Sequence, residues 1–259
     1  MDKSTFGGIF LALGGILAGL LLEGGKITQI IQPTAAMIVL GGTLGAVMVQ
    51  FPLATVGQAL HGLARVFLDR AEDPRKLIQE LVKFALRARK GGIVSLDSEL
   101  ANIKEPFLKK ALTLAVDGIE PEELRKMMEL EIDNEAEHSE KVAQVFESAG
   151  GFAPTIGIIG AVLGLIQVMQ HLENIDEVGK GIAVAFVATI YGVGSANLVF
   201  LPSAGKLKIK GRADQILREM TLEGVISILE GMNPRILETK LMGYMVEHKP
   251  GKQQGAHPA

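Results

Sequence analysis

Four long apolar stretches constrain the fold of this chain more than any other feature. Each is close to the roughly 20 residues that a helix needs to cross a hydrocarbon core about 30 Å thick. Hydrophobic residues make up 48% of the chain and the mean hydropathy is +0.31, which favours an integral membrane protein. The four stretches lie near Phe6–Leu22, Thr34–Phe51, Phe152–Leu172 and Gly181–Leu201.

The segment between the second and third stretches is charged and has helical periodicity. Strand signals are nearly absent, and a lipid-exposed span must be a helix or part of a closed barrel. We therefore predict an all-α integral membrane protein with four transmembrane helices, two plus two, and a helical cytoplasmic domain between spans two and three. The predicted parts are transmembrane helices 1 and 2 (1–52), the cytoplasmic helical domain (53–149), transmembrane helices 3 and 4 (150–205), C-terminal cytoplasmic helices (206–246) and a disordered tail (247–259).

Local signals place several helix ends in the charged segments. Pro74 suits the first position of a helix that ends at Gly91-Gly92, because proline is tolerated there and glycine favours helix termination. A second helix is predicted from Glu122 to about Ser148, running straight into the third span. The C-terminal helical segment is expected to break at 231–234.

Basic residues set the expected orientation. Of 26 lysines and arginines, only Lys26 and Lys180 fall in the two short connections between paired spans, and cytoplasmic loops normally carry the excess of basic residues. The charged segments and both termini are therefore predicted to be cytoplasmic. A cleaved signal peptide is the alternative for the first stretch, but a basic n-region is missing and a second span follows at once, so we expect a retained span.

Composition and motifs argue against several functional classes. The absence of cysteine and the net charge of −3 decide little, but the chain has no strong cationic stripe and few aromatics, so nucleic acid is not an expected partner. No catalytic motif occurs in a suitable context, and the five histidines lack metal-ligand spacing. We predict a protein that is not an enzyme, with no metal and no cofactor.

Small residues form a stripe on each of the last two spans. Such stripes let helices pack closely in lipid, or they surround a narrow path, and the sequence alone allows both interpretations. Pro154 and Pro202 bracket the pair; each is either a helix boundary or a site that frees a backbone carbonyl. The stripes consist of Gly157, Gly160, Ala161 and Gly164 on the third span, and Ala185, Ala188, Thr189, Gly192, Ser195 and Ala196 on the fourth.

Polar groups in these spans are few. Thr189 and Tyr191 are the notable hydroxyls near the middle of the fourth span; a threonine there most often bonds to its own helix, and acts as an ion ligand only with suitable neighbours. No Asp, Glu, Lys, Arg or His lies in the core of any span. Proton paths usually contain a buried ionisable group, so this chain alone cannot form a whole proton path.

The chain resembles the MotA/PomA family of flagellar motor stator subunits over nearly its whole length. The resemblance rests on the two-plus-two topology and on the motifs APTIGIIGAVLGLI (153–166), VATIYGVGSANLVFLPSAGKLKIK (187–210), RKGGIVSLD (89–97) and EGVISILEGMNPRILETKL (223–241). It implies a membrane stator in which five copies surround two copies of a MotB-like partner that supplies the ion-carrying aspartate. TolQ/ExbB-type subunits, which energise envelope processes, share the ion-path motifs and are the alternative.

The resemblance also implies roles for individual residues. Pro154, Pro202 and Thr189, with Tyr191 beside it, match the ion path, and Arg89 and Asp97, with Lys90, match the charged residues that engage the rotor protein FliG. The family more often has glutamate where this chain has Asp97. Sodium-driven members carry threonine at the position of Ala161, so its alanine implies H⁺ as the translocated ion rather than Na⁺.

Overall fold

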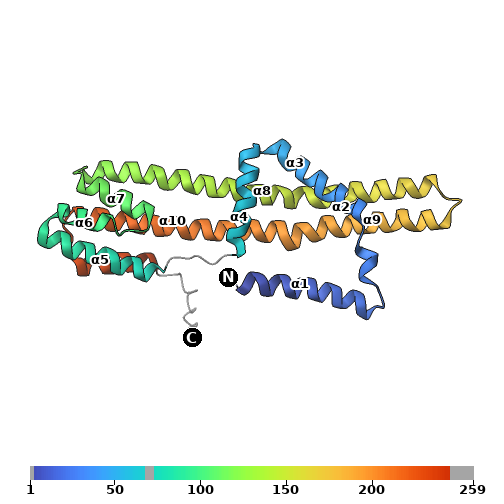
Figure 1. The fold of residues 1–259 in the computed structure, drawn as a ribbon, viewed down its shortest axis with the longest axis horizontal. Helices are drawn as coiled ribbons and strands as arrows, with labels where there is room; N and C mark the ends of the chain where they lie inside the picture. The colour runs from blue at the N-terminus through green and yellow to red at the C-terminus, as the bar shows by residue number, and fades with distance from the viewer. Residues whose placement is uncertain (1–2, 68–72, 246–259) are drawn as a thin grey trace, which may run out of the picture. The chain divides into compact units, whose positions relative to one another are not determined.

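A computed structural model describes residues 3–67 and 73–245. Within these ranges every regular element is a helix, as predicted (Figure 1). The chain divides into two compact units, one formed by residues 1–70 and 137–211, the other by 71–136 and 212–259. The predicted disordered tail, 247–259, lies outside the described residues.

The first unit contains the first two spans. Helix α1 (Lys3–Leu22) forms the first, and a short turn, η1 (Ile27–Ile30), precedes the second. The second span consists of α2 (Pro33–Ala36), a π-helical turn η2 (Met37–Gly41) and α3 (Gly42–Gln50). After Pro52, α4 (Leu53–Phe67) follows as an amphipathic helix.

Two much longer helices carry the last two spans. Helix α8 (Pro121–Gln170) is continuous, which confirms that the charged helix predicted from Glu122 runs directly into the third span. Helix α9 (Ile175–Ser195), a π-helical turn η4 (Ala196–Phe200) and α10 (Leu201–Leu229) follow one another without a break. Four helical segments in the described part of the chain are long and apolar enough to cross a membrane, so the prediction of four spans is confirmed.

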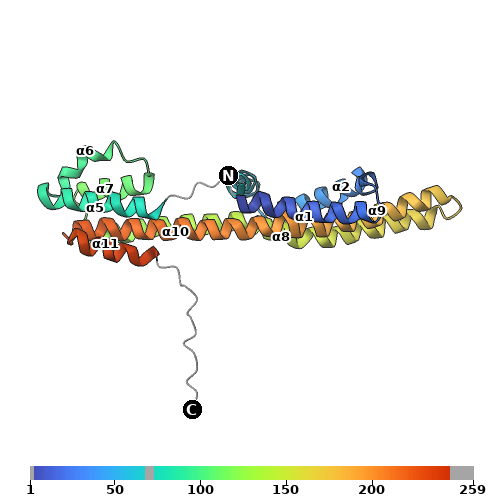
Figure 2. The same ribbon diagram turned by 90° about the horizontal axis from the view of Figure 1, so that it is seen from below.

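The second unit contains shorter helices grouped beside parts of α8 and α10 (Figure 2). The predicted helix ends are found where the sequence places them. The side chain of Asp73 caps α5 at the Arg75 amide, and Gly92, where α5 ends, has φ +77°, a conformation that glycine adopts at little cost. The helices are α5 (Pro74–Gly91), η3 (Ile93–Leu96), α6 (Asp97–Leu100), α7 (Pro106–Val116), α11 (Pro234–Met242) and η5 (Gly243–Met245).

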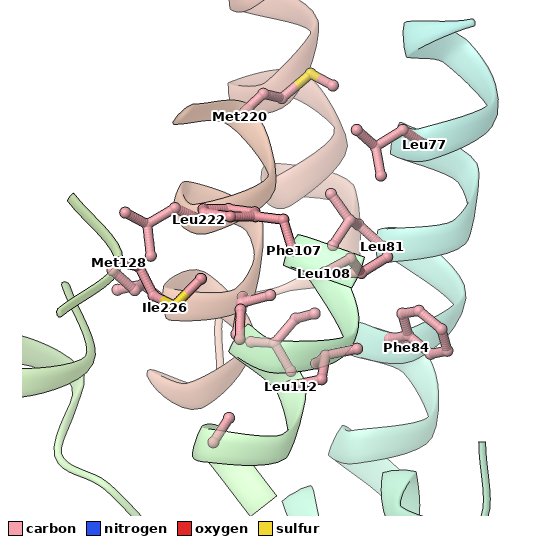
Figure 3. Close-up of a cluster of buried hydrophobic side chains, with 14 of the residues drawn as sticks. Leu77, Leu81, Phe84, Phe107, Leu108, Leu112, Met128, Met220, Leu222 and Ile226 are labelled. Carbon is pink, nitrogen blue, oxygen red and sulfur yellow. The ribbon is translucent and has the colours of Figure 1, made fainter. Parts of the chain in front are cut away.

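One hydrophobic core holds the second unit together. Figure 3 shows side chains of α5, α7, α8 and α10 meeting in this core. Because these side chains come from segments far apart in the sequence, the core fixes α5 and α7 against α8 and α10 and so supports the loop that joins α5 to α6. Its members include Leu77, Leu81 and Phe84 of α5, Phe107, Leu108 and Leu112 of α7, Met128 of α8, and Met220, Leu222 and Ile226 of α10.

Candidate functional site

The small-residue stripes of the last two spans face each other. A Cβ built on Gly157 would lie 2.9 Å from the Ala188 carbonyl oxygen, and one on Gly192 would lie 2.5 Å from the Ala153 carbonyl oxygen. Such distances leave no room for a side chain larger than hydrogen. Within this chain the stripes therefore serve close packing of α8 against α9, which was one of the two interpretations left open by the sequence.

Both prolines lie within continuous helical runs. Pro154 lies inside α8, so the interpretation of it as a helix boundary is wrong, and its missing N–H leaves the Gly150 carbonyl without its usual donor. Pro202 is the second residue of α10, which continues from α9 and the η4 turn without a break, so it is not a helix boundary either. Leu201, the residue before Pro202, packs against Gly150, four positions before Pro154 on α8.

Pro202 borders a cavity of about 390 Å³ whose other lining residues include Ser4 and Gly8 of α1, Asn197 and Lys206. Pro154 is not among its lining residues. This cavity therefore adjoins Pro202 but not Pro154.

Thr189 and Ala161 lie half-buried on α9 and α8. The Thr189 hydroxyl donates a hydrogen bond to the Ala185 carbonyl at 3.2 Å, the local bond expected of a threonine in a span. Its Cα lies 3.5 Å from the Cβ position of Gly157, so Thr189 is placed beside the α8–α9 contact. Ala161 brings no hydroxyl to this region.

Tyr191 has a structural partner that the sequence did not indicate. Its hydroxyl donates to the Ile30 carbonyl at 2.6 Å and accepts from the Gln32 amide at 3.2 Å. These bonds fix the start of the second span against α9. The partners are some 160 positions earlier in the sequence, which is why no local pattern could reveal them.

The described spans contain no Asp, Glu, Lys, Arg or His in their apolar parts. Ionisable side chains gather instead at the end of the third span, around a cavity of about 550 Å³. There Nε2 of His171 lies 3.4 Å from Oε2 of Glu177, with Lys180 and Gln167 also lining the cavity.

The second unit brings the three predicted rotor-contact residues to one corner. Arg89 and Lys90 lie in the last turn of α5, and Asp97 begins α6. All three side chains are exposed, and in the described ranges none of them makes an ion pair with another residue. Leu96, fully buried in the core, anchors the connection between the two helices.

An ion pair that the sequence did not indicate closes this corner. The Arg87 guanidinium bonds to the Glu99 carboxylate and, at 3.2 Å, to the Ser98 hydroxyl, so it joins α5 to α6 directly. Ser95 adds a bond of 2.7 Å to the Gly92 carbonyl. The corner is therefore held in shape while Arg89, Lys90 and Asp97 stay available to a partner.

A second ion-pair network lies at the centre of the second unit. The Glu223 carboxylate, with 14% of its side chain exposed, accepts from Arg125 at 2.9 Å and from Lys240, so it joins α8, α10 and α11. Lys240 also donates to the Ser227 hydroxyl at 3.3 Å. Burial, followed by the negative charges of Glu223 and Glu219, raises the pKa of nearby Tyr244. This network is structural, and spacing in the sequence gave no signal for it.

Comparison with known proteins agrees with the four membrane spans and the helical fold described above. Residues 99–221 match the sequence model of the MotA/TolQ/ExbB proton channel family, and residues 6–92 match that of the motility protein A N-terminal region. Motility protein A of Bacillus subtilis is 36% identical over 95% of this chain and 91% of its own length.

Two solved structures have the same fold. The C. jejuni MotAB structure aligns with a TM-score of 0.90 at 34% identity, covering 96% of this chain and 98% of its own. The flagellar MotAB stator complex of Bacillus subtilis aligns with a TM-score of 0.87 at 35% identity, covering 94% and 96%. The chain belongs to the motility protein A family of MotA/TolQ/ExbB proton channels.

Proposed function

We propose that this chain is the channel-forming subunit of a flagellar stator, which converts proton flow into torque on the rotor. The stator role follows from family membership and from the likeness to MotAB complexes. The match to the motility protein A N-terminal model at residues 6–92 favours this role over the TolQ/ExbB-like alternative. The function is transport, with no enzymatic reaction and no bound cofactor.

The absence of Asp, Glu, Lys, Arg and His from the apolar parts of the four described spans is the observation that carries the proposal. A path that transfers protons needs a group that can take up and release them, and such groups are costly but usual in membrane transport sites. We infer that a MotB-like partner, present in two copies, supplies this carboxylate. Five copies of this chain surround it, with Thr189, Tyr191, Ala161, Pro154 and Pro202 in or beside the path.

Ala161 supports the proton as the transported ion. Sodium is bound by several oxygen ligands, as hard cations require, and the half-buried methyl group of Ala161 offers none. An elementary charge crossing the membrane releases about 2.3 kcal/mol per 100 mV, which is the free energy available for rotation. Exposed apolar side chains of the spans, such as Phe10 and Phe186, contact lipid.

The corner formed by Arg89, Lys90 and Asp97 is the proposed contact with the rotor protein FliG. Its exposed charges are suited to a partner with the complementary pattern, and electrostatic contacts of this kind weaken as salt increases. The contact requires the second unit and both termini to be on the cytoplasmic side of the inner membrane, in agreement with the basic residues that flank the spans.

Stoichiometry and ion selectivity test the proposal together. The chain is co-expressed with a MotB-like partner, the purified complex is weighed by native mass spectrometry, and flux is measured in vesicles with separate proton and sodium gradients. We expect five copies of this chain with two of the partner, and a current that follows the proton gradient. A current that follows sodium and ignores pH would contradict proton coupling, and a different stoichiometry would contradict the assembly.

A further inference from the structure

Thr43 carries the one buried side-chain polar atom without a hydrogen-bond partner among the described residues. Only 2% of the residue is exposed, and it lies at the start of α3, in the second span. A buried hydroxyl that makes no hydrogen bond is unfavourable by about 1–3 kcal/mol, and most buried polar side-chain atoms in native proteins bond to protein or to an ordered water. Thr43 therefore requires an explanation.

Three other hydroxyls in the spans each make a hydrogen bond. Thr155 donates to the Phe152 carbonyl at 2.8 Å, Thr189 to the Ala185 carbonyl at 3.2 Å, and Ser195 to the Gly192 carbonyl at 3.2 Å. Each uses a carbonyl three or four positions earlier on its own helix. The lack of such a bond at Thr43 is thus a property of its position and not of hydroxyls in this membrane protein.

The backbone just before Thr43 is the π-helical turn η2. It ends directly before α3, and the Gly42 amide bonds to the carbonyls of both Ile38 and Val39. Val39 is the residue four positions before Thr43, and the Thr43 hydroxyl does not bond to its carbonyl. π-helical turns occur often at functional positions.

The surroundings of Thr43 exclude lipid. Val39, one turn before it, is fully buried in a cluster with Val187 and Ala188 of α9, and Val47, one turn after it, is 3% exposed in a second cluster. A Cβ on the adjacent Gly42 would lie 2.8 Å from Ile156 of α8. Thr43 therefore lies at the junction of three spans, at the level of Pro154 on α8.

We propose that Thr43 binds an internal water molecule that links its hydroxyl to the carbonyls of the η2 turn. The hydroxyl can both donate and accept, and the Val39 carbonyl has a second lone pair, so the site offers the two or more polar partners that a buried water requires. Water inserted beside a widened helical turn is a known way to satisfy displaced backbone groups. The site places a polar, exchangeable molecule where the second span meets the last two spans.

A structure of the assembled complex in lipid, at a resolution that shows ordered waters, tests this site directly and does not depend on ion conduction. We expect a water within hydrogen-bond distance of Oγ1 of Thr43. A hydroxyl that instead donates directly to a protein carbonyl, or a dry site, would overturn the proposal.

The thermal stability of two variants of the full complex gives an independent test. Thr43→Ser keeps the hydroxyl and should keep the melting temperature close to that of the parent, whereas Thr43→Val keeps the shape, removes the water's main partner and should lower it. If the site is dry, Thr43→Val removes an unsatisfied group and leaves the melting temperature unchanged or raises it, which counts against the proposal. Val39→Thr, one turn earlier on the same face, is the control for adding a hydroxyl where no water is proposed, and should lower the melting temperature.

Discussion

Replacement of Gly192 by alanine tests whether α8 and α9 depend on direct backbone contact. The new Cβ would lie 2.5 Å from the Ala153 carbonyl oxygen and 3.0 Å from the Gly157 Cα. Both neighbours are backbone atoms, so no side-chain rotation relieves the contact, and the helices must separate by about 1 Å to restore normal van der Waals distances. Overpacking of this kind costs about 1–3 kcal/mol.

Gly194→Ala is the matched control, because a Cβ at Gly194 meets nothing within 4 Å. Both substitutions replace glycine in a helical segment and gain a similar helix propensity, up to about 1 kcal/mol. This gain cancels in the comparison, so Gly192→Ala should be less stable than Gly194→Ala by about 1–3 kcal/mol in reversible unfolding of the reconstituted protein. Equal stability of the two variants would refute close packing of α8 on α9 through Gly192.

Three further predictions concern single side chains. Tyr191→Phe should destabilise the protein by about 1–3 kcal/mol, because the Ile30 carbonyl and the Gln32 amide lose their partner. Faster amide hydrogen exchange at residues 30–32 would report this loss, and unchanged exchange would contradict it. Glu223→Gln should lower the free energy of unfolding by about 2 kcal/mol, because two charged hydrogen bonds are weakened. The control Glu230→Gln, at an exposed position, should stay within about 0.5 kcal/mol of the parent. Thermal unfolding compares the two variants, and equal losses would argue against the network. Arg89→Glu should abolish most torque in a tethered-cell assay without changing assembly, and normal torque would count against the rotor contact.

The helices of the second unit were predictable from local signals. Asp73-Pro74 and Gly91-Gly92 mark the two ends of α5, and the unbroken run of apolar and charged periodicity gave α8 as one helix. These features depend on residues close together in the chain, where capping, proline and glycine act over a few positions. The apolar lengths predicted the spans for the same reason.

Features that depend on distant residues could not be predicted in this way. The bonds of Tyr191 to the start of the second span, and the junction of α8, α10 and α11 at Glu223, become visible only when the helices are placed together. The π-helical turns at 37–41 and 196–200 also have no simple sequence signature. Pro154 illustrates the limit well, since proline usually ends a helix but here lies within α8.

In the proposed stator, the spans of this chain carry no Asp, Glu, Lys, Arg or His in their apolar parts, so a partner must complete the proton path. Proton flux into vesicles under a fixed pH gradient tests this with the chain alone, with the chain and its MotB-like partner, and with a partner whose membrane aspartate is changed to asparagine. We expect flux only in the second case. Conduction by the chain alone, or undiminished conduction with the asparagine partner, would contradict it.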